Sequence, residues 1–108
     1  MMKPQLAEER RTAKRISFRT EIEWAGPDMP VIQTRTGNLS TGGTFIETIT
    51  NLQVGTVLRL KFSAGGQEVR VIGKVCYRLP QRGIGVQFLN LSPEQRAAIE
   101  SVMQERSK

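Results

Sequence analysis

The clearest pattern in the sequence is an alternation of apolar and polar residues that begins at Ile16. From there to Trp24 nearly every second side chain is apolar, and charged or hydroxyl side chains stand between them. A period of two is typical of a β-strand with one buried and one exposed face. The pattern recurs farther along the chain and, together with weaker extended segments, predicts six strands. The expected strands lie at about residues 16–24, 31–36, 44–48, 57–62, 69–79 and 84–88.

Turn-forming residues separate these segments. Gly26-Pro27-Asp28 and residues 80–83 indicate turns, residues 37–43 are expected to form a loop, and residues 64–67 indicate a hairpin turn. In the long segment 69–79, simple alternation predicts one buried face made of Val69, Val71, Val75, Tyr77 and Leu79. The same alternation exposes Arg70, Lys74, Cys76 and Arg78.

A clear helical pattern is found at the C-terminal end. Ser92 is a suitable N-cap, Pro93 suits the first helical position, and Gln95 completes a capping box with Ser92. An apolar stripe follows at helical spacing and is expected to pack against the domain: Ala98, Ile99, Val102 and Met103. Several short strands followed by one helix, here about residues 93–105, predict a small antiparallel barrel or sandwich.

Composition narrows the class of function. The 108 residues have a net charge of +6, and six of the 16 basic residues lie within residues 1–20, beside two acidic ones. Such a basic segment attracts phosphate-bearing partners, although a solvated tail has the same composition. The chain has no histidine and one cysteine, so the usual zinc sites and the Ser-His-Asp and Cys-His arrangements are excluded. We therefore expect a binding module rather than an enzyme, with no catalytic residues, no metal and no cofactor.

No stretch of the sequence is long and apolar enough to cross a membrane, and no secretory signal is recognisable. The lone cysteine rules out an internal disulfide and fits a reducing compartment. These features predict a cytoplasmic protein that does not insert into membranes.

Two polar constellations are candidates for ligand binding. The first contains Arg10, Arg11 and Arg15, whose planar guanidinium groups can bind phosphate oxygens and stack on or bond to bases. The second includes Asn38 and Ser40, which offer polar groups to a purine edge, and a pair of glycines that leave room for it, Gly42 and Gly43. Taken alone, the first also fits a solvated basic cluster and the second a plain turn.

Together the two constellations resemble the signature of the PilZ family, R-x-x-x-R followed by [D/N]-x-S-x-x-G. Arg11 and Arg15 match the first element, and Asn38, Ser40 and Gly43 match the second. The likeness continues through Gly43–Thr48, Val54–Leu60, Gly85–Phe88 and Leu91–Gln95, so it covers roughly residues 9 to 103.

The resemblance implies a six-stranded antiparallel β-barrel with a C-terminal helix. It implies a flexible arm at residues 1–9 and a single domain at 10–106, with a switch segment at 10–15, the barrel at about 16–90 and the helix at about 93–105. It also implies a receptor for cyclic di-GMP. Arg11 and Arg15 would bind phosphates and guanine, Asn38 and Ser40 would bond guanine edges, and Gly43 would hold the loop. An arginine at position 10 is associated in the family with two stacked ligand molecules.

The expected mechanism is an ordering of the N-terminal segment on the ligand, which would present a new surface to an unidentified protein effector. The receptor is expected to be a monomer or weak dimer, and Cys76 a passive surface thiol. Two alternatives stay open: a PilZ-like adaptor that does not bind nucleotide, and a small basic barrel that binds nucleic acid. Nucleic acid is not expected because Phe18, Trp24, Phe62 and Tyr77 alternate into apparent core faces instead of forming an exposed stacking surface.

Overall fold

The computed structural model describes residues 15–106, which contain seven strands and one helix. The elements are β1 (Ile16–Ser17), β2 (Glu21–Ala25), β3 (Ile32–Leu39), β4 (Gly43–Glu47), β5 (Val57–Ala64), β6 (Gln67–Leu79), β7 (Gly83–Leu89) and α2 (Pro93–Arg106). The expectations for the arm at 1–9 and for most of the switch segment lie outside the described residues.

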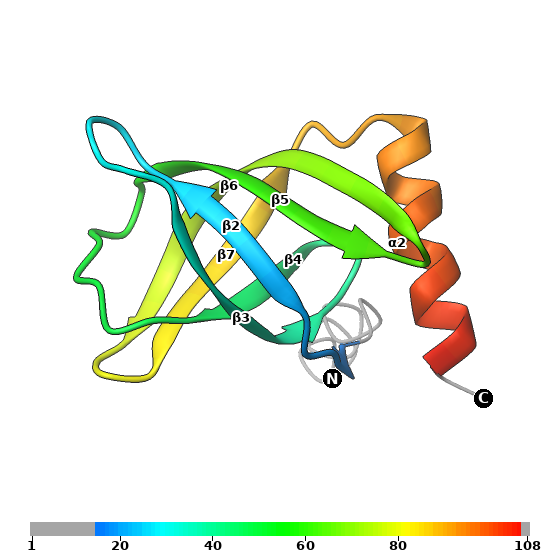
Figure 1. Cartoon of the computed structure of the whole chain (residues 1–108), viewed down its shortest axis with the longest axis horizontal. Coiled ribbons are helices and arrows are strands. Elements are labelled where there is room, and N and C mark those ends of the chain that lie inside the picture. The colour runs from blue at the N-terminus through cyan, green and yellow to red at the C-terminus, as the bar shows by residue number, and fades with distance from the viewer. Residues whose placement is uncertain (1–14, 107–108) are drawn as a thin grey trace, which may run out of the picture.

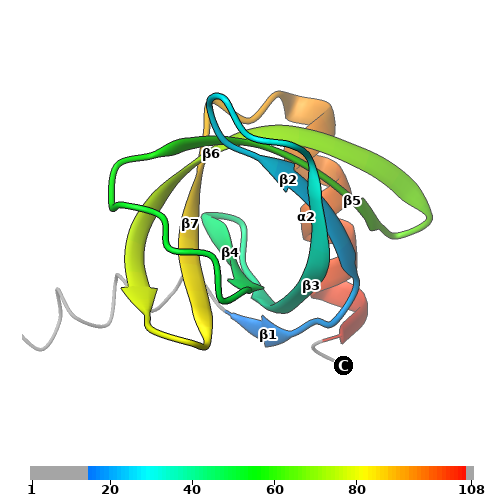
Figure 2. The same ribbon diagram turned by 60° about the vertical axis from the view of Figure 1, so that its left-hand side comes forward.

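The strands form one closed antiparallel barrel. Their order is β1-β3-β2-β5-β6-β7-β4, and β4 also pairs with β3, which joins the two ends of the sheet. Figure 2 looks into the resulting ring. The six longer strands, β2 to β7, build the barrel wall, while the two residues of β1 extend one edge of β3. This confirms the predicted fold class, a six-stranded barrel followed by a helix. Closure pairs the strand edges that an open sheet would leave free.

The barrel is filled by the inward faces of its strands. Leu58, Leu60 and Phe62 of β5 are each at most 3% exposed, as their alternation predicts. Trp24 is 1% exposed, and its indole Nε1 donates a hydrogen bond to Thr34 Oγ1 at 3.1 Å, which satisfies its one polar group.

Helix α2 lies across one end of the barrel (Figure 1). Its apolar stripe joins the barrel core, with Ile99 completely buried. The helix begins with the predicted capping box: the backbone N–H of Ser92 donates to Gln95 Oε1 at 2.7 Å, and the Gln95 N–H donates to Ser92 Oγ at 3.1 Å.

The first two strands differ from the sequence-based expectation. The segment 16–24 is interrupted at residues 18–20, so it forms two strands rather than one. The prediction of a loop at 37–43 is wrong for residues 37–39 and for residue 43, because β3 continues to Leu39 and β4 begins at Gly43. A β-bulge between Thr36 and Asn38 accommodates an extra residue there, and both Thr36 and Leu39 are completely buried.

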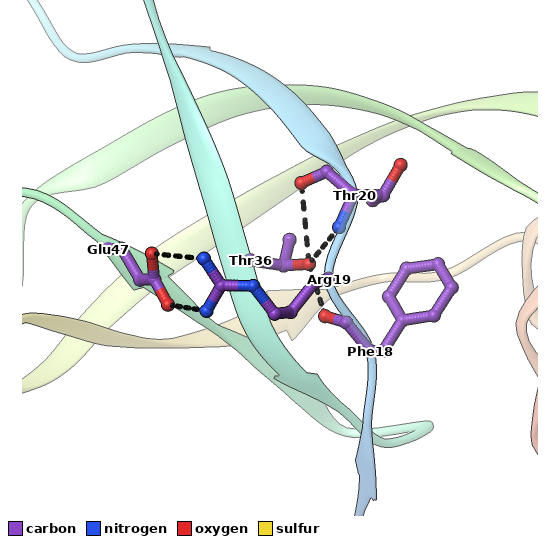
Figure 3. A network of polar contacts seen from close by, with 5 residues as sticks. All are labelled: Phe18, Arg19, Thr20, Thr36 and Glu47. Carbon is purple, nitrogen blue, oxygen red and sulfur yellow. Dashed lines mark hydrogen bonds and ion pairs between the residues drawn. The ribbon is translucent and has the colours of Figure 1, made fainter.

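A polar network fixes the break between β1 and β2 to the barrel wall (Figure 3). The buried hydroxyl of Thr36 donates to the carbonyl of Phe18 at 2.5 Å and accepts from the N–H of Thr20 at 3.0 Å. Between these residues, the Arg19 guanidinium forms two hydrogen bonds with the Glu47 carboxylate, at 2.5 and 3.2 Å. The main chain at 18–20 leaves the regular ladder but keeps two backbone hydrogen bonds to β3, from the Phe18 N–H to the Gly37 carbonyl at 3.3 Å and from the Thr36 N–H to the Thr20 carbonyl at 2.9 Å. The Thr36 hydroxyl supplements these bonds at the Phe18 carbonyl and the Thr20 N–H.

A second bulge changes the exposed face of β6. The register shifts between Val75 and Tyr77, so two residues of β6 oppose one residue of β7. Tyr77 and Leu79 are therefore 39% and 38% exposed, and the prediction that they lie on the buried face is wrong. Cys76 is exposed as expected, and its thiol donates to the Gly85 carbonyl at 3.2 Å.

Candidate functional site

Arg15 and Asn38 are brought together by the pairing of β1 with β3. The two residues are 23 positions apart, and Arg15 Nη1 donates a hydrogen bond to Asn38 Oδ1 at 2.6 Å. Ser17 lies opposite Asn38 in the ladder, which places the residue before β1 beside the end of β3. Arg15 is exposed, and within residues 15–106 its other guanidinium N–H groups form no further hydrogen bond. This arginine therefore presents oriented donors at the surface.

Ser40 shapes the turn between β3 and β4. It is 2% exposed, and its Oγ accepts hydrogen bonds from the N–H groups of Gly42 and Gly43, both at 3.1 Å. Its own N–H donates to the Gly43 carbonyl at 2.9 Å. The hydroxyl is engaged by the loop itself, as in many turns that contain serine. Its expected bond to a guanine edge stays a prediction.

The two glycines of the turn are in very different surroundings. A Cβ on Gly43 would lie 2.1 Å from the carbonyl oxygen of Val86, so only glycine permits this approach of β4 to β7. Gly42 is exposed, and a Cβ there would meet nothing nearer than Ser40 Oγ at 3.8 Å. Gly43 is therefore required by the barrel, and Gly42 borders open space next to Arg15's partner strand.

An aromatic pair, the exposed Tyr77 and the half-buried Phe45, lies on the same outer face as Asn38. Along the ladder, Asn38 is opposite Phe45, Phe45 is opposite Gly85, and Gly85 is opposite Tyr77. The rings of Phe45 and Tyr77 are stacked, with centroids 6.3 Å apart and planes inclined by 26°. Gly85 permits this arrangement, because a Cβ on it would lie 2.1 Å from the Tyr77 ring. Sequence reasoning missed this pair because strict alternation places Tyr77 inside.

A second row of outward-facing residues starts at Gly43. Gly43 lies opposite Gln87, and Gln87 lies opposite Lys74, both of which are exposed. Lys74 adds a cation to the outer surface, two strands away from the turn. Its outward position was predicted from the alternation in β6, but only the strand register connects it with Gly43.

The remaining predicted site residues, Arg10 and Arg11, lie outside the described residues. Within residues 15–106 there is no cluster of three or more His, Cys, Asp or Glu side chains that could hold a metal ion. Over the same range, no helix has both the length and the apolar character needed to cross a membrane.

Residues 9–105 match the PilZ domain family, which is nearly the whole chain. The chain belongs to the PilZ family. The Arg15–Asn38 contact and the Ser40–Gly43 turn thus bring together the two elements of the PilZ signature. No curated protein sequence matches this PilZ domain.

Solved structures with the same fold include two PilZ domains and a motility inhibitor. The PilZ domain of CeSA from a cellulose-synthesizing bacterium has 20% sequence identity and a TM-score of 0.66, and the match covers 85% of this chain and 97% of that one. The motility inhibitor MotI (DgrA) of Bacillus subtilis has 16% identity and a TM-score of 0.72, over 86% of this chain and 49% of its own. The PilZ domain of YcgR from Escherichia coli, solved with cyclic di-GMP, has 20% identity and a TM-score of 0.68, over 89% and 93%. At these identities the likeness shows the shared fold.

Proposed function

We propose that this PilZ domain is a receptor for cyclic di-GMP and binds it on the outer wall of the barrel, beside Arg15 and Asn38. The observation that carries the proposal is the 2.6 Å hydrogen bond between these two residues, which belong to the two separate motif elements. The contact supports a single binding surface, because it joins one residue of each element. The PilZ domain of YcgR, which has the same fold, was solved with this ligand.

The chemistry of the surface suits a ligand with both phosphates and guanines. Arg15 and the sequence neighbours Arg10 and Arg11 offer guanidinium groups to phosphate oxygens, and Lys74 adds a further cation. The amide of Asn38 can donate and accept along a guanine edge. The Tyr77 ring, 39% exposed, offers a flat face for stacking a base.

The proposed signal is an ordering of the arginine-bearing segment on the ligand. Bound phosphates neutralise the mutual repulsion of Arg10, Arg11 and Arg15, and the segment then presents a new surface to a protein effector. Arg10, directly before the first motif element, supports a stoichiometry of two ligand molecules per chain. A hydrogen-exchange measurement with and without ligand tests this mechanism. The mechanism requires reduced exchange of residues 5–15 when ligand is added, and unchanged exchange in the presence of tight binding refutes it.

The decisive experiment is isothermal titration of the full chain with cyclic di-GMP, with Arg15→Ala and Arg59→Ala as matched variants. Arg59 is an exposed arginine on β5, so its removal changes the net charge equally without touching the proposed site. The receptor function requires binding that Arg15→Ala abolishes and Arg59→Ala preserves. Absence of binding to the unmodified chain refutes the function and favours an adaptor that contacts only proteins. A saturating ratio of 1:1 refutes the role assigned to Arg10.

A further inference from the structure

A groove of about 490 Å³ lies on another part of the barrel wall, over β2, β5 and β6. It is bordered by Val31 before β3 and by residues 89, 90 and 95 near the start of α2. This volume lies in the range of sites that hold small ligands or a few side chains. None of the residues that line the groove belongs to the cyclic di-GMP site proposed above, so the inference below does not depend on that function.

Part of the groove, called the floor below, is apolar where a barrel wall normally faces water; it consists of Ala25, Ile72 and Leu89. Ala25, Arg59, Ile72 and Leu89 form one row across four neighbouring strands, each opposite the next. Ile72 is 42% exposed, although the residues two positions before and after it on β6, Arg70 and Lys74, are charged. Val31, at the edge of the groove, is 62% exposed. Such neighbouring exposed aliphatic residues are typical of a surface that another molecule covers.

The rim of the groove is predominantly cationic. Three cations, Arg59, Lys61 and Arg70, line it together with one carboxylate, Glu23. Lys61 Nζ lies 3.3 Å from Glu23 Oε1 in a partly exposed pair, and Arg70 pairs with Glu68 at 2.6 Å. Arg59 has no ion pair or hydrogen bond with any residue in the described range 15–106. Exposed ion pairs of this kind are weak, so Lys61 and Arg70 can leave these partners and pair with carboxylates of an incoming molecule.

We propose that this groove docks an acidic peptide segment of a partner protein, with an aliphatic side chain on Ile72 and carboxylates on Arg59 and Arg70. The excess of positive charge selects an acidic segment, and the aliphatic floor selects one that also carries apolar residues. A nucleic acid fits less well, because the groove lacks an exposed aromatic ring among its described lining residues. The one aromatic residue of the lining, Trp24, is 1% exposed and offers no face for base stacking.

The experiment uses the ¹⁵N-labelled 108-residue chain and two synthetic peptides of eight residues, one alternating glutamate with leucine and the other alternating glutamine with leucine. At low salt, the glutamate peptide is expected to shift the amide signals of Arg59, Lys61 and Ile72. The glutamine peptide is expected to bind roughly tenfold more weakly, because it lacks the charges that the rim selects. Equal binding of the two peptides, or shifts centred on Arg15 and Asn38, overturns the proposal.

Two variants test the contributions of the rim and of the floor to peptide binding separately. Arg59→Glu reverses a charge at the rim, Ile72→Thr keeps a β-branched residue in the strand while removing apolar surface, and each is expected to weaken the glutamate peptide roughly fivefold or more. Arg82→Glu, in the exposed turn between β6 and β7, changes the net charge equally and is the matched control. Loss of binding in Arg82→Glu equal to that in Arg59→Glu means that only net charge matters and overturns the proposal. Groove signals that move on dilution of the protein alone indicate a second copy as occupant and overturn it as well.

Discussion

Replacing Gly43 by alanine should destabilise the barrel, although it adds a single methyl group. The new Cβ would lie 2.1 Å from the Val86 carbonyl oxygen, 3.1 Å from the carbonyl carbon and 3.2 Å from Gln87 Cα. All three atoms belong to the backbone of β7, which has no side-chain rotamer available to relieve the contact. Real Cβ contacts are essentially never shorter than 3.0 Å, so β4 and β7 must separate by roughly 0.9 Å.

The expected loss of stability follows from the interactions that this separation of β4 and β7 disrupts. Overpacking of a rigid site costs about 1–3 kcal/mol. The Phe88 N–H donates to the Gly42 carbonyl at 2.8 Å, and this bond and its neighbours in the β4–β7 ladder lengthen, at a cost of about 1 kcal/mol for each bond lost. We expect a loss of about 3 kcal/mol in the free energy of unfolding, which corresponds to a fall in Tm of roughly 12–24 °C for a domain of this size.

Urea and thermal denaturation of Gly43→Ala and Gly42→Ala provide the measurement and its control. Neither glycine has a left-handed backbone conformation, and a Cβ on Gly42 meets open space. Gly42→Ala should therefore change the free energy of unfolding by less than about 1 kcal/mol. A Gly43→Ala protein as stable as the unmodified chain, or equal destabilisation by both substitutions, would refute the steric reasoning.

Three further predictions concern other contacts. Thr36→Val keeps the shape of a buried side chain but leaves the Thr20 N–H without its acceptor, so the free energy of unfolding measured in urea should fall by about 2 kcal/mol. Thr36→Ser keeps the hydroxyl and should lower it less. A valine variant as stable as the unmodified chain contradicts this reasoning. The hydrogen bond from Arg70 lowers the pKa of Glu68, so the pair stabilises the folded state at neutral pH, and this stabilisation is lost as the pH falls through the lowered pKa. Arg70→Ala should therefore raise the Glu68 pKa in an NMR titration. An unchanged pKa contradicts the assignment. Tyr77→Ala should keep the fold and weaken cyclic di-GMP binding roughly tenfold, with Tyr77→Phe close to the unmodified chain; unchanged affinity of the alanine variant removes stacking from the proposed site.

Much of the fold follows from local patterns in the sequence. The strict alternation in β5 predicts which side chains fill the barrel, and Leu58, Leu60 and Phe62 are buried as expected. The capping box of Ser92 and Gln95 predicts where α2 begins. Both signals depend on residues only two to four positions apart, so the sequence alone contains them.

The two bulges could not be predicted in this way. Alternation assumes a constant phase along a strand, and one extra residue reverses the phase of everything that follows. Val75-Cys76-Tyr77 contains no glycine or proline that marks the shift in β6. The room for Tyr77 on the outer face is made by Gly85 on the neighbouring strand, and this pairing is fixed only by the folded register.

The same distinction between local sequence patterns and folded register applies to the candidate site. The motif spacing predicts that Arg15 and Asn38 bind one ligand together; this stays a prediction, and the structure adds that the two side chains are hydrogen-bonded. The contacts of Ser40 and Gly43 depend on the turn's own N–H groups and on the Val86 carbonyl, which no motif encodes. Ligand contacts of all these residues remain predictions that the titration tests.

The polar network around Thr36 also indicates which parts of the domain can tolerate a change of sequence. The main chain at Phe18 and Thr20 is held by a buried hydroxyl, and Arg19 is held by Glu47, so the barrel is anchored at the first residues of its wall. Upstream of this anchor, the backbone of the described chain pairs with the barrel only through the two residues of β1, so nearly all of the barrel's register lies downstream of it. We therefore expect the domain to tolerate substitutions before residue 15 better than substitutions at Thr36, whose hydroxyl is buried in the barrel wall.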